Sequence, residues 1–198
     1  MNEDKTKAAV FIIESLSEEE EEQEEKYEGK LLQQILKLSK IESTYYYIRT
    51  RKEFVRILQL FGDSKYRYLH LSCHGNKEKI KLTYDEINFT EFAEDLGIRG
   101  FEERRLFLSS CFIANDNLAN AMNSTSCYSI IGFDTEVKFS DAAIFWSSFY
   151  HQIFKHNKKE MKKEKVKQVI KKLSIVFELK VLFYSYDNEL EKLIRILL

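Results

Sequence analysis

The stretch that decides the fold is "YLHLSCHG", residues 68–75, where a short apolar run ends on a His-Gly pair. A second apolar run, "LFLSSC" at 106–111, ends on a cysteine, in a chain with only four histidines and three cysteines. Both runs are typical of short buried strands. If they belong to one parallel sheet, their carboxyl ends face the same crevice, where such sheets gather their functional groups. The sequence therefore predicts that His74 and Cys111 lie close together.

Strands and helices alternate along the rest of the chain. Strands are predicted from β-branched, aromatic and apolar content at 7–16, 43–49, 66–72, 104–110, 128–134 and 177–186. Helices are predicted between and after them, at 30–40, 50–62, 89–97, 115–122, 141–154, 158–173 and 188–198. Helix starts are marked by the Thr50–Glu53 and Asn88–Glu91 pairs and by Ser140 as a cap. This repetition predicts an α/β fold, with a mostly parallel sheet covered by helices on both faces.

The composition indicates one folded domain. The chain has 198 residues, of which 44% are hydrophobic, so it can bury a sizeable core without a disulfide or metal. No apolar run approaches the roughly 18 residues of a membrane span, and the N-terminus lacks the apolar segment of a signal peptide. The odd number of cysteines agrees with a reducing compartment. We therefore expect a cytoplasmic protein with a single domain at 1–198 and an acidic mobile loop at about 17–29.

A histidine beside a cysteine has a definite chemical use. The imidazole can stabilise the thiolate, which is the nucleophile, and can later protonate a leaving amine. Gly75 has no side chain, so its backbone N–H can approach a substrate carbonyl and help to hold an oxyanion. The structural alternative is that Cys111 is a small buried hydrophobe and His74 a satisfied polar residue. Spacing alone leaves both interpretations open.

The segment at 66–154 resembles the caspase-like cysteine peptidases of the CHAT family, within the group of caspases, separases, legumains and gingipains. The family's histidine motif is an apolar strand, a small residue and Cys-His-Gly, here "LHLSCHG". Its cysteine motif is an apolar strand, two small residues and a cysteine, here "LFLSSC". The connection "IKLTYDEINFTEFAEDL" and the later helix "SDAAIFWSSFYHQIF" also match.

The resemblance implies a caspase-like three-layer sandwich with a six-stranded sheet in the order 2-1-3-4-5-6. It implies a His74–Cys111 dyad, with the backbone N–H groups of Gly75 and Cys111 as oxyanion donors. It further implies a protein substrate and an activating or regulatory protein partner, and we expect no cofactor and no metal. The chain departs from the family before its fifth strand: family members often have a small residue at that point, whereas this chain has Cys127 and Tyr128.

Three functions compete. The first is a cysteine endopeptidase with Cys111 as nucleophile and His74 as acid–base group, activated by a partner in a prokaryotic defence or signalling system, such as antiviral defence. The second is a catalytically silent caspase-like adaptor or regulatory subunit. The third is a flavodoxin-like domain that binds a nucleotide or phosphate. Against the third, the acidic stretch "FIIESLSEEEEE" at 11–22 would repel an anion after the first strand.

The segment after the fifth strand contains candidate specificity residues. In "GFDTEVKFSD" at 132–141, Asp134 lies at the strand end and Glu136 follows two residues later. A carboxylate there would favour Arg or Lys before the scissile bond through a charge-assisted hydrogen bond. The alternative is that Asp134 caps a turn and that the substrate pocket is apolar.

The remaining charged and sulfur-containing residues give weaker signals. The lysine-rich segment at 158–172 favours a solvated helix face over nucleic-acid binding, because it has little aromatic interleaving. The acidic segment at 18–28 is the preferred docking or cleavage site for an activating protein. Cys73 and Cys127 are expected in the core. A zinc site of Cys73, His74 and Cys111 lacks a fourth ligand and is disfavoured.

Overall fold

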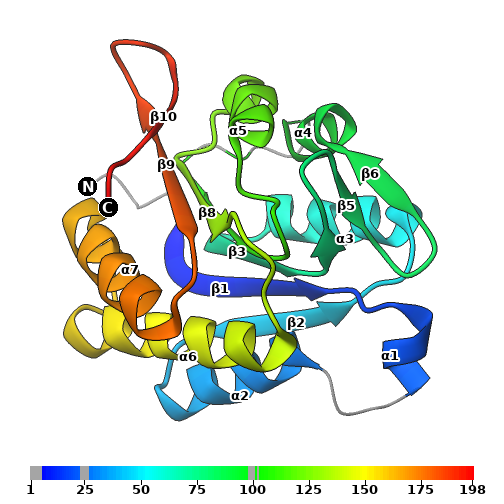
Figure 1. Cartoon of the computed structure of the whole chain (residues 1–198), viewed down its shortest axis with the longest axis horizontal. Helices are drawn as coiled ribbons and strands as arrows, with labels where there is room; N and C mark the ends of the chain where they lie inside the picture. Colours follow the sequence, from blue (N-terminus) through cyan, green and yellow to red (C-terminus); the bar gives the residue numbers. More distant parts are fainter. Residues whose placement is uncertain (1–5, 23–26, 98–100, 102) are drawn as a thin grey trace.

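The centre of the molecule is a seven-stranded sheet (Figure 1), in a computed structural model that describes residues 6–22, 27–97, 101 and 103–198. Its strands are β1 (Lys7–Glu14), β2 (Ser43–Tyr47), β3 (Tyr66–Ser72), β7 (Arg105–Ser109), β8 (Ser129–Phe133), β9 (Val181–Asp187) and β10 (Lys192–Arg195). The order across the sheet is β2-β1-β3-β7-β8-β9-β10. The first five in this order are parallel, whereas β9 is antiparallel to β8 and β10 is antiparallel to β9.

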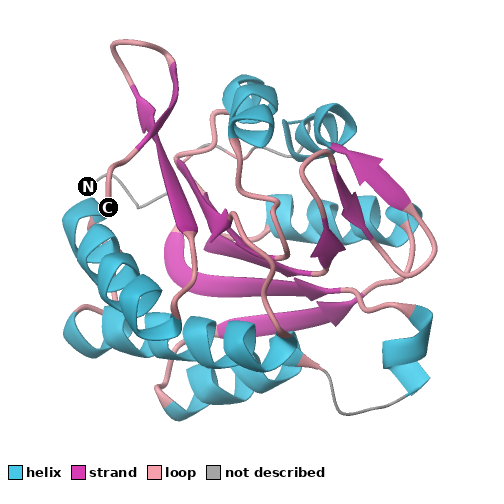
Figure 2. Cartoon of the chain, in the orientation of Figure 1, coloured by secondary structure: helices cyan, strands magenta, loops and turns pink. Residues whose placement is uncertain are grey.

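Helices cover both faces of the sheet, which gives three layers (Figure 2). On one face lie α3 (Arg51–Asp63), α4 (Phe89–Gly97) and α5 (Asp116–Met122), and on the other lie α2 (Glu28–Leu38), α6 (Phe139–His156) and α7 (Lys163–Phe177). The alternation of side chains in β1 explains the arrangement. Phe11 and Ile13 pack under the first group of helices, and Val10 and Ile12 pack under the second. A near-continuous apolar run is therefore buried on both sides, as expected for a central parallel strand.

The predicted fold class is confirmed, but the sheet has seven strands rather than six. The prediction of a closing helix at 188–198 is wrong, because that segment contains β10, which pairs with the outer edge of β9. Leu193 enters the core, and its backbone N–H donates to Asn123 Oδ1 at 2.7 Å. Strand pairing and this contact outweigh the local helical pattern, which is a weak determinant of structure.

Two predicted helix starts are confirmed, and one is wrong. Thr50 and Glu53 form the capping box of α3, and Asn88 and Glu91 exchange the equivalent hydrogen bonds at α4. Ser140 is not a cap, because α6 already begins at Phe139.

The acidic segment expected as a mobile loop contains a short helix, α1 (Glu18–Glu22), and the start of α2. Residues 23–26 of that segment lie outside the described residues. After β3 the chain forms a small three-stranded sheet of β4 (His74–Gly75), β5 (Lys79–Lys81) and β6 (Glu86–Asn88), which matches the hairpin expected after the His-Gly pair.

Candidate active site

His74 and Cys111 lie at equivalent positions beyond two adjacent strands. Ser72 and Ser109, the last residues of β3 and β7, are partners in the parallel register, and His74 and Cys111 each follow two residues later. The backbone N–H of Cys73 continues the pairing by donating to the Ser109 carbonyl at 3.1 Å. Both side chains line one cavity of about 250 Å³. The sequence-predicted pair is therefore brought together at the carboxyl edge of the sheet.

Gly75 follows His74 and packs tightly against the residue before Cys111. A Cβ atom at position 75 would lie 2.5 Å from Ser110 Oγ and 3.2 Å from the Lys79 carbonyl oxygen. Neither atom can give way easily, because Ser110 is buried and the carbonyl belongs to β5. Only glycine therefore allows the two site loops to approach this closely.

The Cys111 thiol is held by the loop that follows β8. Its Sγ accepts a hydrogen bond from the Val137 backbone N–H at 3.4 Å and lies 3.6 Å from the Val137 carbonyl oxygen. The next residue, Phe112, has a φ of 55°, in the left-handed region that non-glycine residues rarely adopt. Such backbone strain is concentrated at functional sites. Cys111 is partly exposed, unlike the other two cysteines.

Cys73 and Cys127 lie in the core, as predicted, with exposed fractions of 4% and 1%. Burial raises the pKa of the Cys73 thiol, and it raises the pKa of the Cys127 thiol to about 12. Both are therefore protonated and unreactive at neutral pH.

The His74 imidazole is bonded to a carboxylate that the sequence pattern did not single out. Glu20 Oε2 lies 2.6 Å from His74 Nε2, and the ring of Phe139 packs against the imidazole edge-to-face at 5.4 Å. Burial opposes ionisation of Glu20, but the hydrogen bonds from His74 and the Ser17 backbone outweigh it, so its pKa lies below the usual value. An ionised carboxylate only accepts, so Nε2 carries a proton.

The short helix α1 is held over this cavity by the neighbouring Glu21. The Glu21 carboxylate accepts a hydrogen bond from the Tyr47 hydroxyl and another from Arg49 Nε at 2.8 Å. The side chain of Glu21 has an exposed fraction of only 12%. Through these contacts with β2 and the residues after it, α1 lies beside the cavity, and Glu20 lines the cavity wall.

A buried carboxylate joins the ends of the two strands that carry the pair. Glu28 Oε2 accepts hydrogen bonds from Ser72 Oγ at 2.9 Å and from Ser109 Oγ at 2.7 Å. Its other oxygen, Oε1, lies 3.4 Å from Nε2 of the fully buried His70. Glu28 has an exposed fraction of 4% and lines the same cavity. Glu28 therefore links the last residue of β3 to the last residue of β7, two positions before His74 and Cys111.

The two predicted specificity residues lie in different surroundings. Glu136 lines the cavity with His74 and Cys111. Asp134 is not among the lining residues, and its carboxylate forms an ion pair with Lys180 Nζ at 2.5 Å. Lys138 also lines the cavity, so its wall carries both signs of charge.

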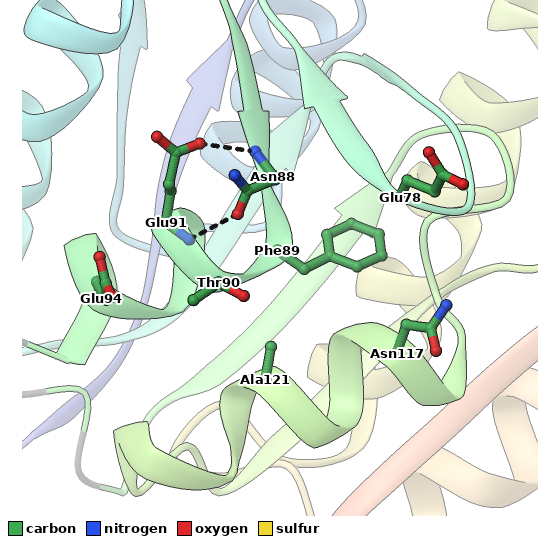
Figure 3. A pocket seen from close by; sticks show the side chains of 8 residues that line it. All are labelled: Glu78, Asn88, Phe89, Thr90, Glu91, Glu94, Asn117 and Ala121. Carbon is green, nitrogen blue, oxygen red and sulfur yellow. Dashed lines mark hydrogen bonds between the residues drawn. The ribbon is translucent and has the colours of Figure 1, made fainter.

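A second and wider cavity, of about 470 Å³, lies between α4, α5 and the loop before β5 (Figure 3). Figure 3 shows Asn88 and Glu91 bonded to each other: Asn88 Oδ1 accepts from the Glu91 N–H, and Glu91 Oε2 accepts from the Asn88 N–H. These polar groups cap α4. Neither His74 nor Cys111 lines this cavity.

Two further observations concern metal binding and membrane-spanning helices. Within the described part of the chain, no three His, Cys, Asp or Glu side chains are grouped so that they could hold a metal ion. No helix in that part combines the length and the apolar character needed to cross a membrane.

Among the solved structures with a similar fold are cysteine proteases. A secreted C11 cysteine protease from Bacteroides thetaiotaomicron, iotapain, matches with a TM-score of 0.60 and 11% identity, over 91% of this chain and 66% of that one. The Arg-specific cysteine proteinase gingipain R matches with a TM-score of 0.57 and 11% identity, over 90% of this chain and 46% of that one. The complex of the pro- and mature domains of Porphyromonas gingivalis RgpB gives a TM-score of 0.55 and 9% identity, over 90% of this chain and 48% of that one.

The chain thus spans between about half and two thirds of the length of these neighbours. No protein-family model and no curated protein matches the sequence. At such low identity the likeness concerns the fold alone. Together with the sheet order and the three layers, it shows that this chain has a caspase-like α/β fold.

Proposed function

We propose that this chain is a cysteine endopeptidase of the CHAT type, with Cys111 as nucleophile and His74 as acid–base group. One observation carries this function: His74 and Cys111 follow paired residues at the carboxyl ends of adjacent parallel strands and line one cavity. Parallel α/β sheets gather their reactive groups at this edge. The motifs "LHLSCHG" and "LFLSSC" support the CHAT type specifically.

The reaction begins with a proton transfer. In the neutral imidazole Nε2–H is bonded to Glu20, so Nδ1 is the nitrogen that accepts the proton of the Cys111 thiol. The thiolate attacks the peptide carbonyl carbon, and the backbone N–H groups of Gly75 and Cys111 hold the oxyanion. The intermediate collapses when His74 returns the proton to the leaving amine. Water, deprotonated by the same imidazole, then hydrolyses the thioester and releases the acid.

Glu20 acts as a positioning residue in this reaction. Its carboxylate fixes which nitrogen of His74 carries a proton, and it stabilises the imidazolium that forms when the thiol is deprotonated. The Glu20 carboxylate is bonded to His74, and no hydrogen bond between it and the Cys111 thiol is found among the described residues. Its effect on catalysis therefore passes through His74, whose protonated nitrogen it fixes and whose positive charge it stabilises.

The weakness of α1 as an isolated helix supports control of the enzyme by a protein partner. Five consecutive glutamates repel one another, and a helix of five residues is too short to be stable alone. Its position depends on the contacts of Glu21 with Tyr47 and Arg49. A basic protein surface that docks on the acidic segment would stabilise α1 and hold Glu20 against His74. Such a switch suits a cytoplasmic peptidase in a prokaryotic defence or signalling system.

A basic residue before the scissile bond fits the cavity best. Glu136 lines it without an ion-pair partner among the described residues, whereas Asp134 is neutralised by Lys180. Glu136 is therefore the carboxylate we assign to substrate selection, through a charge-assisted hydrogen bond to Arg or Lys. Gingipain R, one of the structural neighbours, is Arg-specific.

Cleavage of a mixed peptide library by the purified chain tests this function. We expect cuts after Arg or Lys in the wild type, none in Cys111→Ala, and a weakened basic preference in Glu136→Gln with Asp134→Asn as the matched control. Cuts that persist in Cys111→Ala would overturn the peptidase assignment. A wild type that cleaves nothing, with or without a basic peptide bound to the acidic segment, would instead favour a silent adaptor.

A further inference from the structure

We propose that a third cavity, at the amino edge of the same sheet, binds the phosphoryl group of a small phosphorylated molecule. This cavity has a volume of about 310 Å³, and four cationic side chains line it: Arg67, Arg105, Lys162 and Lys163. The volume is in the range of small-molecule sites.

The cavity lies at the opposite end of the strands that carry the dyad. Tyr68 and Arg105, which line it, are paired at the start of the β3–β7 ladder, whereas His74 and Cys111 follow its other end. Arg105 begins β7 and Cys111 lies two residues past its end, which corresponds to a distance on the order of 20 Å. A ligand bound here would not contact the peptide being cleaved.

In the part of the chain that the structure describes, the two arginines of this cavity have only neutral hydrogen-bond partners. Arg105 has an exposed fraction of 5% and donates to Ser129 Oγ at 3.0 Å and to the Met161 carbonyl at 2.8 Å. Arg67 donates to Thr6 Oγ1 and to the Thr6 and Lys159 carbonyls. Among the described residues, no carboxylate forms an ion pair with either guanidinium.

Arg105 is a buried positive charge without an ion-pair partner among the described residues, and the half-buried Arg67 places a second cation beside it. Burial lowers the pKa of Arg105, and the neighbouring charge of Arg67 lowers it further. Buried charges in proteins are normally paired, because desolvation costs several kcal/mol per ion. An anion in the cavity would supply the missing counter-charge, and guanidinium groups match the tetrahedral oxygens of a phosphoryl group well.

The start of α7 adds to the positive potential. Lys162 is the N-cap residue and its side chain makes no capping bond, so the first N–H groups of this 15-residue helix are left for another acceptor. The positive end of the helix dipole favours an anion at the same place. Lys163, the first residue of the helix, also lines the cavity.

Two further features define the ligand. The ring of Tyr128 stacks on the Arg105 guanidinium at 4.6 Å and remains 41% exposed, so it offers a face to a flat ring on the ligand. Two carboxylates, Glu103 and Glu160, also line the cavity, and Glu160 lies 3.6 Å from Lys162 Nζ. Among the described lining residues the four cations outnumber these two carboxylates, which favours a small phosphorylated molecule over a longer polyanion.

Titration calorimetry with the purified full chain tests the site. The probes are inorganic phosphate, adenosine monophosphate and adenosine, at constant ionic strength set with chloride. We expect phosphate to bind, the monophosphate to bind more tightly, and adenosine not to bind. Arg67→Gln and Lys163→Gln should each weaken binding about tenfold, since each removes a charge-assisted hydrogen bond. Lys171→Gln, an exposed lysine of α7 outside the cavity, should leave binding unchanged.

A thermal shift measurement provides a second readout, because a ligand that binds only the folded state raises the melting temperature. Phosphate should raise it in the wild type and in Lys171→Gln, and by less in Arg67→Gln and Lys163→Gln. The site would be overturned if none of the probes bound, or if Arg67→Gln and Lys163→Gln both bound phosphate as tightly as Lys171→Gln does.

Discussion

Glu20 and His74 are joined by a hydrogen bond of 2.6 Å, although 54 positions separate them in the chain. The bond links the most acidic segment of the sequence to the imidazole of the proposed dyad. Because α1 is short and composed only of glutamates, the contact depends on how the surrounding residues hold that helix. The geometry of His74 is therefore coupled to a weakly stable element.

Replacement of Glu20 by Gln should lower kcat about 100-fold and change KM little. The amide retains the size of the side chain but no longer stabilises the imidazolium, so transition-state rather than ground-state binding is lost. Steady-state kinetics on a basic peptide measures both parameters. Glu19→Gln, at an exposed position of the same helix, is the matched control and should behave as the wild type. Equal or higher kcat in Glu20→Gln would show that the carboxylate does not support catalysis.

Replacement of Gly75 by Ala should abolish most of the activity and lower the free energy of unfolding by about 1–3 kcal/mol. The added Cβ would lie 2.5 Å from Ser110 Oγ, so the two loops of the site must move apart. Gly97→Ala is the control, because a Cβ there has no neighbour closer than 3.8 Å. Urea unfolding and peptide turnover should separate the two variants. Wild-type activity in Gly75→Ala would contradict the close approach of the loops.

Iodoacetamide should modify Cys111 alone in the folded protein. Cys73 and Cys127 are almost completely buried and burial raises the pKa of both thiols, whereas Cys111 is partly exposed in the cavity. Mass spectrometry of digested samples identifies the labelled residue. Labelling should slow markedly in His74→Ala, since the imidazole no longer stabilises the thiolate. A labelling rate that is the same with and without His74 would argue against a functional dyad.

The buried carboxylate of Glu14 should make the fold less stable as the pH rises. Burial raises its pKa from 4.5 to about 7, although hydrogen bonds from Gly29 N and the Tyr45 hydroxyl oppose the shift. The folded state therefore binds more protons than the unfolded state between pH 4.5 and 7. Over this range the group removes about 3 kcal/mol of stability, after which the loss is complete.

Glu14→Gln keeps the size of the side chain and cannot ionise, so this part of the pH dependence should disappear. Urea unfolding of both proteins from pH 4.5 to 8 measures it, and the variant should gain stability relative to the wild type as the pH rises. Parallel stability curves for the two proteins would show that Glu14 does not titrate in this range.

The sequence predicted that His74 and Cys111 lie close together because strand ends can be read from local patterns. Apolar runs that end on His74 and Cys111 imply a shared edge of a parallel sheet, and the strand register agrees. The burial of Cys73 follows from the alternation of side chains, and the caps at Thr50 and Asn88 follow from short-range hydrogen bonds.

The contacts of the acidic segment could not be predicted in the same way. Consecutive glutamates at 18–22 are indistinguishable by pattern, and only the tertiary structure selects Glu20 for His74 and Glu21 for Arg49. The link that Glu28 makes between β3 and β7 depends equally on long-range packing. At the C-terminus, pairing with β9 decides that residues 192–195 form a strand, and this too is a long-range effect.

Turnover of a basic peptide by wild type, Cys111→Ala, His74→Ala and the double variant tests the central claim most directly. Both changes remove a reactive group with little change to the core, so circular dichroism and urea unfolding should show intact folds. We predict that either single change lowers turnover by several orders of magnitude and that the double variant loses little more, because the two residues act as a unit. Wild-type turnover in folded Cys111→Ala would contradict the assignment of Cys111 as the nucleophile.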